Sequence, residues 1–351
     1  MKKVVKYINV LLFIFLLLLV SCKSEENISN TNNLNINQKV ELSDTRLSLG
    51  TVCYIKIYGG NQEILNNCFN ILDDITDSMA VNLKDSQIYK INELNLNEKF
   101  QVDSDLKLIL DKSFEMSEFT KNYFDISLGS IVNLWQIGTD KQHLPNDIDI
   151  SNALKSVGLN NIVWDGKYIS RKNLDTKLDL GAIAKGFAAD KVSEYLKSQN
   201  IKSAIINLGG NVELIGKKPD NSKFKVGIQD PRSDRNQYLG IVELENKTIV
   251  TSGDYERYFI ENGRRYHHIF DRYTGYPSDK GIMAVAIIHN NSMEADALST
   301  ALFAMGKEEG MKLVESLHNV ECMYITNDKE LYATEGFKNV FTLTNSDYSL
   351  K

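Results

Sequence analysis

The stretch FKVGIQDPRSDRNQYLGIVELENKTIVTSGDYERYFIENGRRYHHIF, residues 224–270, decides the fold class of this 351-residue chain. It predicts five short strands, most of them separated by turns of hairpin length, at 224–229, 240–244, 248–251, 257–261 and 267–270. Strands joined this closely run antiparallel, because a parallel crossover needs a dozen or more connecting residues.

Helices are predicted on both sides of this stretch. Apolar residues recur at intervals of three and four over 62–79 and 104–121, and further helices are expected at 186–199, 292–305 and 308–317. Additional strands are expected at 51–57, 201–208, 283–289 and 323–326. Helices kept apart from antiparallel strands predict an α+β fold, a single compact two-lobed domain over residues 41–345.

The N-terminus has the features of a bacterial lipoprotein signal peptide, residues 1–21. Three early lysines precede an apolar run at 8–20, which is too short for a comfortable membrane span. The run ends in Leu-Val-Ser followed by Cys22, the expected lipidation site. The alternative is an uncleaved anchor with a chance cysteine. We expect an exported lipoprotein, anchored on the periplasmic side, with the inner membrane as the favoured location.

Residues 22–40 are rich in Asn and Ser and contain few large apolar side chains. Such a segment buries too little surface to offset its ordering entropy, so we expect a flexible tether. The formal net charge of the whole chain is −6. Nucleic acid is therefore not an expected partner, because phosphate binding needs clustered Lys and Arg.

The four cysteines include no C-x-x-C pair, which excludes a disulfide framework and a zinc site. With Cys22 assigned to lipid, a bridge between Cys53 and Cys68 stays open. We favour three small buried side chains at Cys53, Cys68 and Cys322.

Two segments suggest phosphate and metal chemistry. Residues 178–186 (LDLGAIAKG) place small residues and Lys185 at the start of a predicted helix, where free N–H groups attract phosphate. Asp296 and Thr300 are four residues apart on another predicted helix, so their oxygens share one face and suit Mg²⁺. Taken alone, each segment is better explained by ordinary structure: a tight turn, and a first-turn acid beside a core-edge hydroxyl.

The segment YHHIFDRYTGYP, residues 266–277, contains two of the five histidines. Adjacent strand residues face opposite ways, so His267 and His268 cannot easily share one metal ion. One of them facing a cleft suits a general base, because imidazole exchanges a proton near neutral pH.

These segments, taken together and in order, resemble the ApbE-type FAD:protein FMN transferase family. The matching motifs are LGT at 49–51, YFDIS at 123–127, DLGAIAKG at 179–186, NLGGN at 207–211, TSGDYER at 251–257, HIFDRYTGYP at 268–277 and ADALSTA at 295–301. The resemblance covers roughly residues 42–340, and the ordered set is far more specific than any one motif. It implies an ApbE-like domain with largely antiparallel sheets flanked by helices.

The resemblance also implies an activity: Mg²⁺-dependent transfer of FMN from FAD to a threonine of an exported flavoprotein, with release of AMP. It assigns Mg²⁺ to the backbone carbonyl of Ala184 and the side chains of Asp296 and Thr300, and the base to His268. The implied FAD contacts are Leu49, Asn82, Tyr123, Phe124, Asp125, Gly181, Lys185 and Phe270. Implied acceptors are redox-pump subunits, such as those of Na⁺-translocating quinone reductases and their relatives.

Two positions depart from the family pattern. Arg272 stands where the family has Pro, with little expected consequence in a turn, and Asn82 stands where many members carry Tyr. Three alternatives stay open: a Mg²⁺-dependent FAD pyrophosphatase that uses water as nucleophile, a FAD-binding carrier lipoprotein in the periplasm, and a structural lipoprotein without a ligand. The presence of both Asp296 and His268 counts against the carrier.

Overall fold

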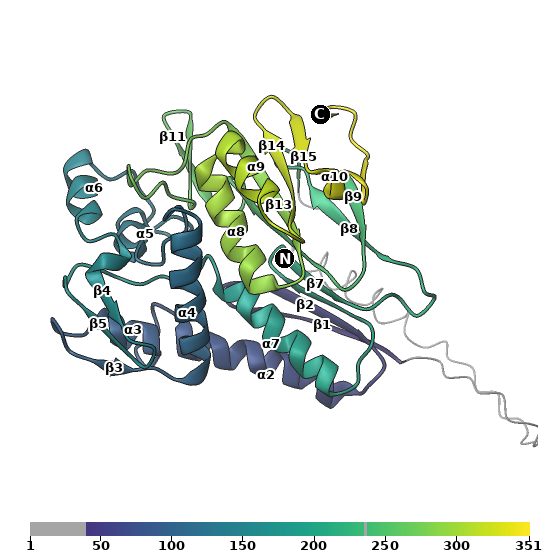
Figure 1. The fold of residues 1–351 in the computed structure, drawn as a ribbon, viewed down its shortest axis with the longest axis horizontal. Helices are drawn as coiled ribbons and strands as arrows, with labels where there is room; N and C mark the ends of the chain where they lie inside the picture. The colour runs from purple at the N-terminus through teal and green to yellow at the C-terminus, as the bar shows by residue number, and fades with distance from the viewer. Residues whose placement is uncertain (1–39, 235–236) are drawn as a thin grey trace, which may run out of the picture. The chain divides into compact units, whose positions relative to one another are not determined.

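The computed structural model of the protein describes residues 40–234 and 237–351 (Figure 1). The described residues belong to one compact unit. The predicted signal peptide, Cys22 and all of the predicted tether except Val40 lie outside the described residues. Within the described part of the chain, no helix is both long enough and apolar enough to cross a membrane.

A large sheet forms the centre of the fold. Its nine strands lie in the order β1 (Glu41–Ser48), β2 (Thr51–Tyr58), β6 (Ala204–Leu208), β7 (Asn211–Ile215), β10 (Thr248–Gly253), β13 (Ile282–His289), β14 (Glu321–Thr326), β15 (Glu330–Ala333) and β17 (Ser349–Leu350). Only the β15–β17 pair is parallel. The predicted α+β fold with largely antiparallel sheets is therefore confirmed.

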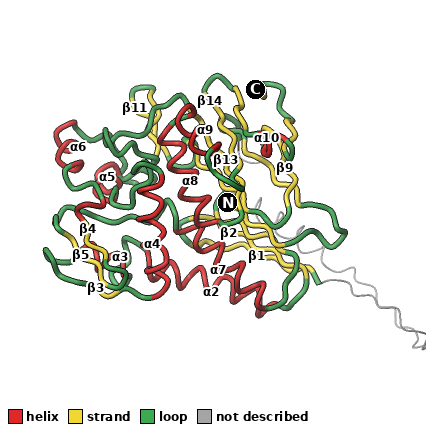
Figure 2. The backbone as a smooth tube through the Cα atoms, in the orientation of Figure 1, coloured by secondary structure: helices red, strands yellow, loops and turns green. Residues whose placement is uncertain are grey.

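Three helices cover one face of this sheet: α2 (Gln62–Met79), α7 (Ala184–Ser198) and α8 (Ser292–Met305) (Figure 2). The apolar spacing of 62–79 predicts α2 to the residue, because Leu65, Phe69 and Leu72 form a buried stripe. The facing strands send every second side chain inward, as Cys53, Ile55 and Ile57 do on β2. Helices and strands thus share one continuous core.

The opposite face of the large sheet packs against a small sheet of β16 (Phe341–Leu343), β9 (Tyr238–Leu244) and β8 (Phe224–Gln229). Every second side chain of β7 faces this small sheet, since Val212 and Leu214 belong to a second core, separate from the core under the helices. The helices α9 (Lys307–Glu315) and α10 (Glu335–Lys338) flank the C-terminal strands.

The smaller lobe carries its own three-stranded sheet. It comprises α3 (Gln87–Asn92), β3 (Phe100–Gln101), α4 (Ser104–Phe119), α5 (Gly129–Trp135), α6 (Asp147–Leu154), β4 (Ile162–Trp164) and β5 (Tyr168–Arg171). An aromatic core surrounds Trp135, whose indole N–H donates to the carbonyl of Gly275 at 2.9 Å. This bond anchors the turn after the histidine pair to the lobe.

The hairpin of β11 (Tyr258–Glu261) and β12 (Arg264–His267) corrects one prediction. The expected strand at 267–270 is wrong, because β12 ends where that strand was expected to begin. Asn262 and Gly263 both have positive φ, which makes a two-residue turn and sets the register of the hairpin. His268 therefore lies beyond the strand, in a bend.

The cysteine prediction is confirmed. Cys53, Cys68 and Cys322 are free and buried, and no bridge joins Cys53 to Cys68. Burial raises the pKa of the Cys68 thiol to about 12, so this group is an inert part of the core.

Candidate functional site

Helices α7 and α8 cap one another at their N-termini. The backbone N–H of Gly186 donates to Oδ2 of Asp296 at 2.9 Å. In return, Asp190 accepts from the N–H groups of Ser292 and Met293, each at 2.9 Å. A carboxylate at a helix N-terminus satisfies free N–H groups and complements the helix dipole. The two helix starts, which are more than a hundred residues apart in sequence, are thus held together.

Glycine at position 186 allows the backbones of α7 and α8 to come this close. A Cβ atom there would lie 2.2 Å from the carbonyl oxygen of Ser292 and 2.6 Å from the Cα of Met293. Because both atoms belong to the backbone of α8, no side-chain rotation could relieve the contact. The small-residue segment 178–186 therefore lets two helices meet.

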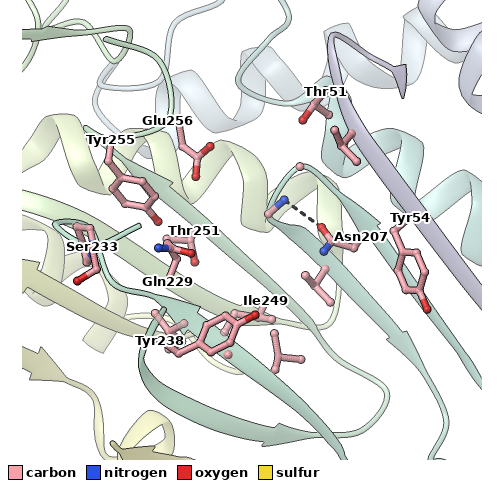
Figure 3. A pocket seen from close by; sticks show the side chains of 18 of the residues that line it. Thr51, Tyr54, Asn207, Gln229, Ser233, Tyr238, Ile249, Thr251, Tyr255 and Glu256 are labelled. Atoms are coloured by element: carbon pink, nitrogen blue, oxygen red, sulfur yellow. Dashed lines mark hydrogen bonds between the residues drawn. The ribbon is translucent and has the colours of Figure 1, made fainter. Parts of the chain in front are cut away.

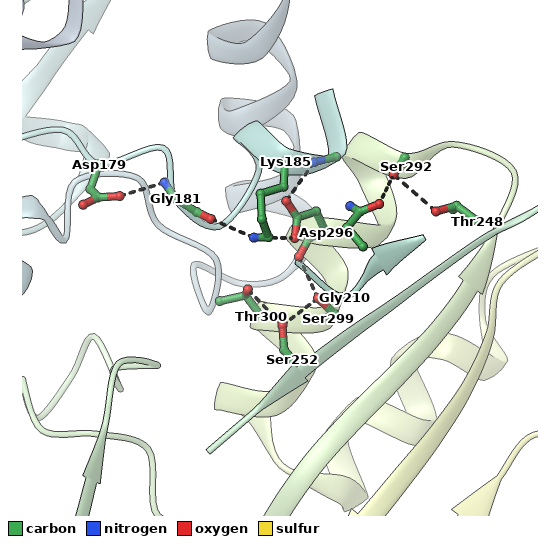
Figure 4. Close-up of polar contacts among 12 residues, drawn as sticks. Asp179, Gly181, Lys185, Gly210, Thr248, Ser252, Ser292, Asp296, Ser299 and Thr300 are labelled. Atoms are coloured by element: carbon green, nitrogen blue, oxygen red, sulfur yellow. Dashed lines mark hydrogen bonds and ion pairs between the residues drawn. The ribbon is translucent and has the colours of Figure 1, made fainter. Parts of the chain in front are cut away.

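Asp296 faces the glycine-rich bend, as Figure 4 shows. Its Oδ1 lies 3.3 Å from Nζ of Lys185, and the same ammonium donates to the carbonyl oxygen of Gly181 at 3.3 Å. Asp296 is only 2% exposed. A buried carboxylate persists where it is paired and hydrogen-bonded, and here it receives one N–H and one ammonium.

Hydroxyl groups continue the site along the next turn of α8. Oγ of Ser252 on β10 lies 2.8 Å from Oγ of Ser299 and 3.5 Å from Oγ1 of Thr300. Ser299 also donates to the backbone carbonyl of Asp296 at 2.9 Å. Ser252 was not among the predicted site residues. Strand alternation could have found it, because Val250 on the same face of β10 belongs to the helix-side core.

The oxygen atoms around Asp296 can be compared with the predicted metal site. In the described ranges, no group of three or more His, Cys, Asp or Glu could hold a metal ion. A cation here would depend on one carboxylate with neutral oxygens, namely Asp296, Thr300 and the carbonyl of Ala184 at the start of α7. Such hard oxygen donors fit Mg²⁺, and the ammonium of Lys185 already shows that a cation is accommodated beside Asp296.

The two adjacent histidines have different environments. His267 is buried, with Nε2 3.0 Å from the carbonyl of Ser278 and Nδ1 accepting from the N–H of Ile269 at 3.2 Å. Both of its ring nitrogens are therefore occupied in structural contacts. His268 is only half-buried, and its Nδ1 lies 3.3 Å from the carbonyl of Arg257.

The ring of His268 is held in its neutral form. Burial of the ring lowers its pKa to about 3, and the positive charges of Arg257 and Lys185 act in the same direction. Protein atoms packed around the ring cause this desolvation, although the residue as a whole is half-buried. A neutral imidazole can accept a proton at neutral pH.

The predicted FAD contacts divide into accessible and buried residues. Leu49 lies half-buried in the β1–β2 turn with φ +52°, and Asn82 and Gly181 are exposed in loops. Tyr123 is half-buried and meets Tyr273 edge-on, with ring centroids 5.8 Å apart.

Phe124 and Phe270 are instead core residues. They are 1% and 6% exposed, and the ring of Phe270 packs against Trp135 with centroids 5.9 Å apart. Their side chains leave little surface for a ligand.

Arg272 corrects our expectation of little consequence. Its guanidinium lies 3.3 Å from Oδ2 of the buried Asp125, whose Oδ1 accepts from the N–H and hydroxyl of Ser127. Burial raises the pKa of Asp125, and the charge of Arg272 opposes that shift. This ion pair ties the turn at 271–275 to the segment that carries Tyr123.

Comparison with known proteins gives the family. The model of the ApbE family matches residues 49–324. The chain belongs to the ApbE family. Among its relatives, the FAD:protein FMN transferase of Klebsiella pneumoniae is 29% identical over 86% of this chain and 94% of its own length. That of Treponema pallidum is 31% identical over 84% and 87%. The crystal structure of the ApbE protein from Thermotoga maritima superposes with a TM-score of 0.78, at 32% identity, over 86% of this chain and 99% of its own.

Proposed function

We propose that this protein is a FAD:protein FMN transferase that uses Mg²⁺ and a threonine acceptor. The observation that carries the proposal is the meeting of Asp296, Lys185 and the N-terminus of α7 at one point, with His268 close enough for the charge of Lys185 to lower its pKa. The relatives named FAD:protein FMN transferase align over most of the chain. A carboxylate, a cation and a helix N-terminus together suit a diphosphate with a divalent ion.

The residues have distinct roles in this mechanism. Asp296, Thr300 and the carbonyl of Ala184 would hold Mg²⁺, which when bound neutralises diphosphate charge and makes phosphorus more open to attack. Lys185 and the α7 N-terminus would bind the diphosphate oxygens of FAD. Gly181 leaves room for the ligand, because it has no side chain.

His268 is the group that moves the proton. Its neutral ring accepts the proton of the acceptor threonine hydroxyl as the threonine oxygen bonds to the phosphorus of the FMN half. The bridging P–O bond breaks, and AMP leaves with the bridging oxygen. No partner for Nε2 of His268 is found among the described residues, whereas both ring nitrogens of His267 are engaged.

The test uses the full chain in detergent with FAD, Mg²⁺ and a peptide that contains Ser-Gly-Ala-Thr. We expect a fluorescent peptide and one AMP per label. Asp296→Asn should lower the rate by about 10²-fold or more, the cost of losing one charged group at a reacting centre. Free FMN and AMP without a labelled peptide would instead show a pyrophosphatase, and FAD that binds but is never cleaved would show a carrier.

A pair of histidine variants tests the base. His268→Ala should leave FAD affinity nearly unchanged and slow transfer by about 10²–10⁴-fold. His267→Ala is the matched control, because His267 adjoins His268 in sequence but has only structural contacts. Greater damage to transfer in folded His267→Ala than in His268→Ala would reverse the assignment.

Location and acceptors are further parts of the proposal. We propose that Cys22 carries lipid on an exported protein, anchored on the periplasmic side, and that the acceptors are subunits of redox pumps. Labelled palmitate should enter the wild-type protein and not Cys22→Ser. Fluorescent flavin bands among exported and membrane proteins should disappear from a gel when the gene is deleted.

A further inference from the structure

A cavity lies on the sheet face opposite α7 and α8. It has a volume of about 880 Å³ and is lined by β2, β6, β7, β8 and β10 together with the loops that follow β8 and β10 (Figure 3). None of the predicted FAD contacts or metal ligands lines it. Asn207 and Tyr54 form one wall, and Tyr238 and Tyr255 form another. The cavity is therefore a separate site from the proposed diphosphate site.

The two sites are nevertheless back to back across one strand. Thr251 of β10 lines the cavity, whereas the next residue, Ser252, contacts Thr300 on the helix side. The segment after β10 also lines the cavity through Tyr255 and Glu256. The carbonyl oxygen of the following residue, Arg257, accepts a hydrogen bond from the backbone N–H of His268 at 3.2 Å. A chain leaving the cavity along this connection would arrive at the proposed base.

Three apolar or aromatic side chains on the rim of the cavity are exposed, among charged neighbours such as Lys225 and Arg232. Val52, Tyr238 and Tyr258 are 49%, 47% and 38% exposed, and all three line the cavity. Leu47, the cross-strand partner of Val52, is 82% exposed. Exposed aromatic and apolar side chains are frequent on surfaces that bind proteins, where tyrosine is enriched. The rim thus favours a polypeptide.

One wall of the cavity is a free strand edge. Among the described residues, β8 pairs only with β9, and residues 224–228 make no other backbone hydrogen bond. An edge strand presents a row of N–H and C=O groups to which an extended peptide can pair. Residues 224–229 of β8 are all among those that line the cavity beside this edge.

We propose that this cavity binds the segment of the acceptor protein around the modified threonine, extended along β8. The inference depends on the proposed transferase function and adds the surface that selects the protein substrate. Backbone pairing with β8 would supply affinity, and the exposed Val52, Tyr238 and Tyr258 on the rim would contact the side chains that flank the threonine. The segment would then pass the β10–β11 connection toward His268.

The test compares two peptides and two double variants of the full chain. The long peptide carries Ser-Gly-Ala-Thr with about eight flanking residues on each side, or about 26 Å of extended chain per flank. The short peptide is the tetrapeptide alone. Val52→Ser with Tyr258→Ser alters the rim. Leu108→Ser with Ile148→Ser is the matched control, because both side chains are exposed and do not line the cavity.

For the wild type and the control we expect the long peptide to have a KM about tenfold below that of the short one. The rim variant should lose this advantage, with kcat and the KM for FAD within twofold of the wild type. In hydrogen exchange of the wild type, the long peptide should protect amides of residues 224–228 and the short one should not.

Three outcomes would overturn the inference. A long-peptide KM that is unchanged in the rim variant, without protection of β8, would exclude the cavity as the acceptor site. A parallel rise in the KM for FAD would assign the cavity to the flavin. A wild type that labels neither peptide nor any exported protein would refute the proposed function itself, and the inference with it.

Discussion

Replacing Gly186 by alanine should separate the two helices that form the diphosphate site. In an ordinary helix this change stabilises by up to about 1 kcal/mol, because alanine is the better helix former. Here the new Cβ would lie 2.2 Å from the carbonyl oxygen of Ser292, whereas ordinary contacts begin near 3.4 Å. The backbones must therefore move apart by about 1 Å, a form of overpacking that costs about 1–3 kcal/mol.

The same movement removes a specific hydrogen bond. The N–H of Gly186 donates to the buried carboxylate of Asp296 at 2.9 Å, and bonds to charged groups contribute about 1.5–3 kcal/mol. Combined with the gain in helix propensity, the net loss of stability is about 1.5–5 kcal/mol. For a chain of this size, with an unfolding entropy of about 2.1 cal/mol/K per residue, that corresponds to a fall in Tm of about 2–7 °C.

Two measurements check this reasoning. Thermal unfolding gives the stability change, and the Mg²⁺ concentration for half-maximal transfer should rise at least about tenfold, because Asp296 loses its fixed position. Ser198→Ala, in the exposed last turn of α7, is the control and should match the wild type in both. A Gly186→Ala protein with unchanged Tm and unchanged Mg²⁺ dependence would refute the steric account of the site.

Three further perturbations follow from buried charges. Burial, aided by the charge of Asp190, raises the pKa of Glu213 to about 8. Between pH 4.5 and 8 this carboxyl is ionised in the unfolded chain but protonated in the folded protein, so wild-type stability should fall across that range. Glu213→Gln should abolish this pH dependence in thermal unfolding. Arg272→Met should cost about 3–5 kcal/mol by stranding the Asp125 carboxylate, more at pH 8 than at pH 5, and Asp125→Asn in the same chain should recover most of the loss in denaturant unfolding. Because the pKa of His268 is about 3, its ring should stay neutral from pH 5 to 8 in the ligand-free protein, and an NMR titration of its Cε1 that shows a midpoint near 6.5 would contradict this.

Local patterns in the sequence determined the elements and the fold class. The apolar period of residues 62–79 gives α2 its exact bounds. Of the successive strands after residue 224, β8 with β9 and β11 with β12 pair antiparallel as the sequence predicts, whereas β9 and β10 lie in different sheets. Asp296 and Thr300 share a helix face because four residues make about one turn. These features depend on neighbours in the chain, so a single sequence carries them.

The end of β12 shows where local pattern fails. The segment HHIF at 267–270 is predicted as a strand, but the turn at Asn262 and Gly263 sets the hairpin register and ends the pairing at His267. That position separates the roles of the two histidines, because it leaves His268 in a bend beside Arg257.

Only the tertiary structure decided which distant groups meet. Nothing in the local sequence joins Asp190 to the first N–H groups of α8, Arg272 to Asp125, or Ser252 to Ser299. Each contact spans tens of residues or more. The first and third exist because the fold brings α7, α8 and β10 together, and the second because the turn after β12 packs on the smaller lobe. The charge state of His268 has the same origin, since desolvation and nearby charges depend on packing in space, and the sequence determines such packing only through the complete fold.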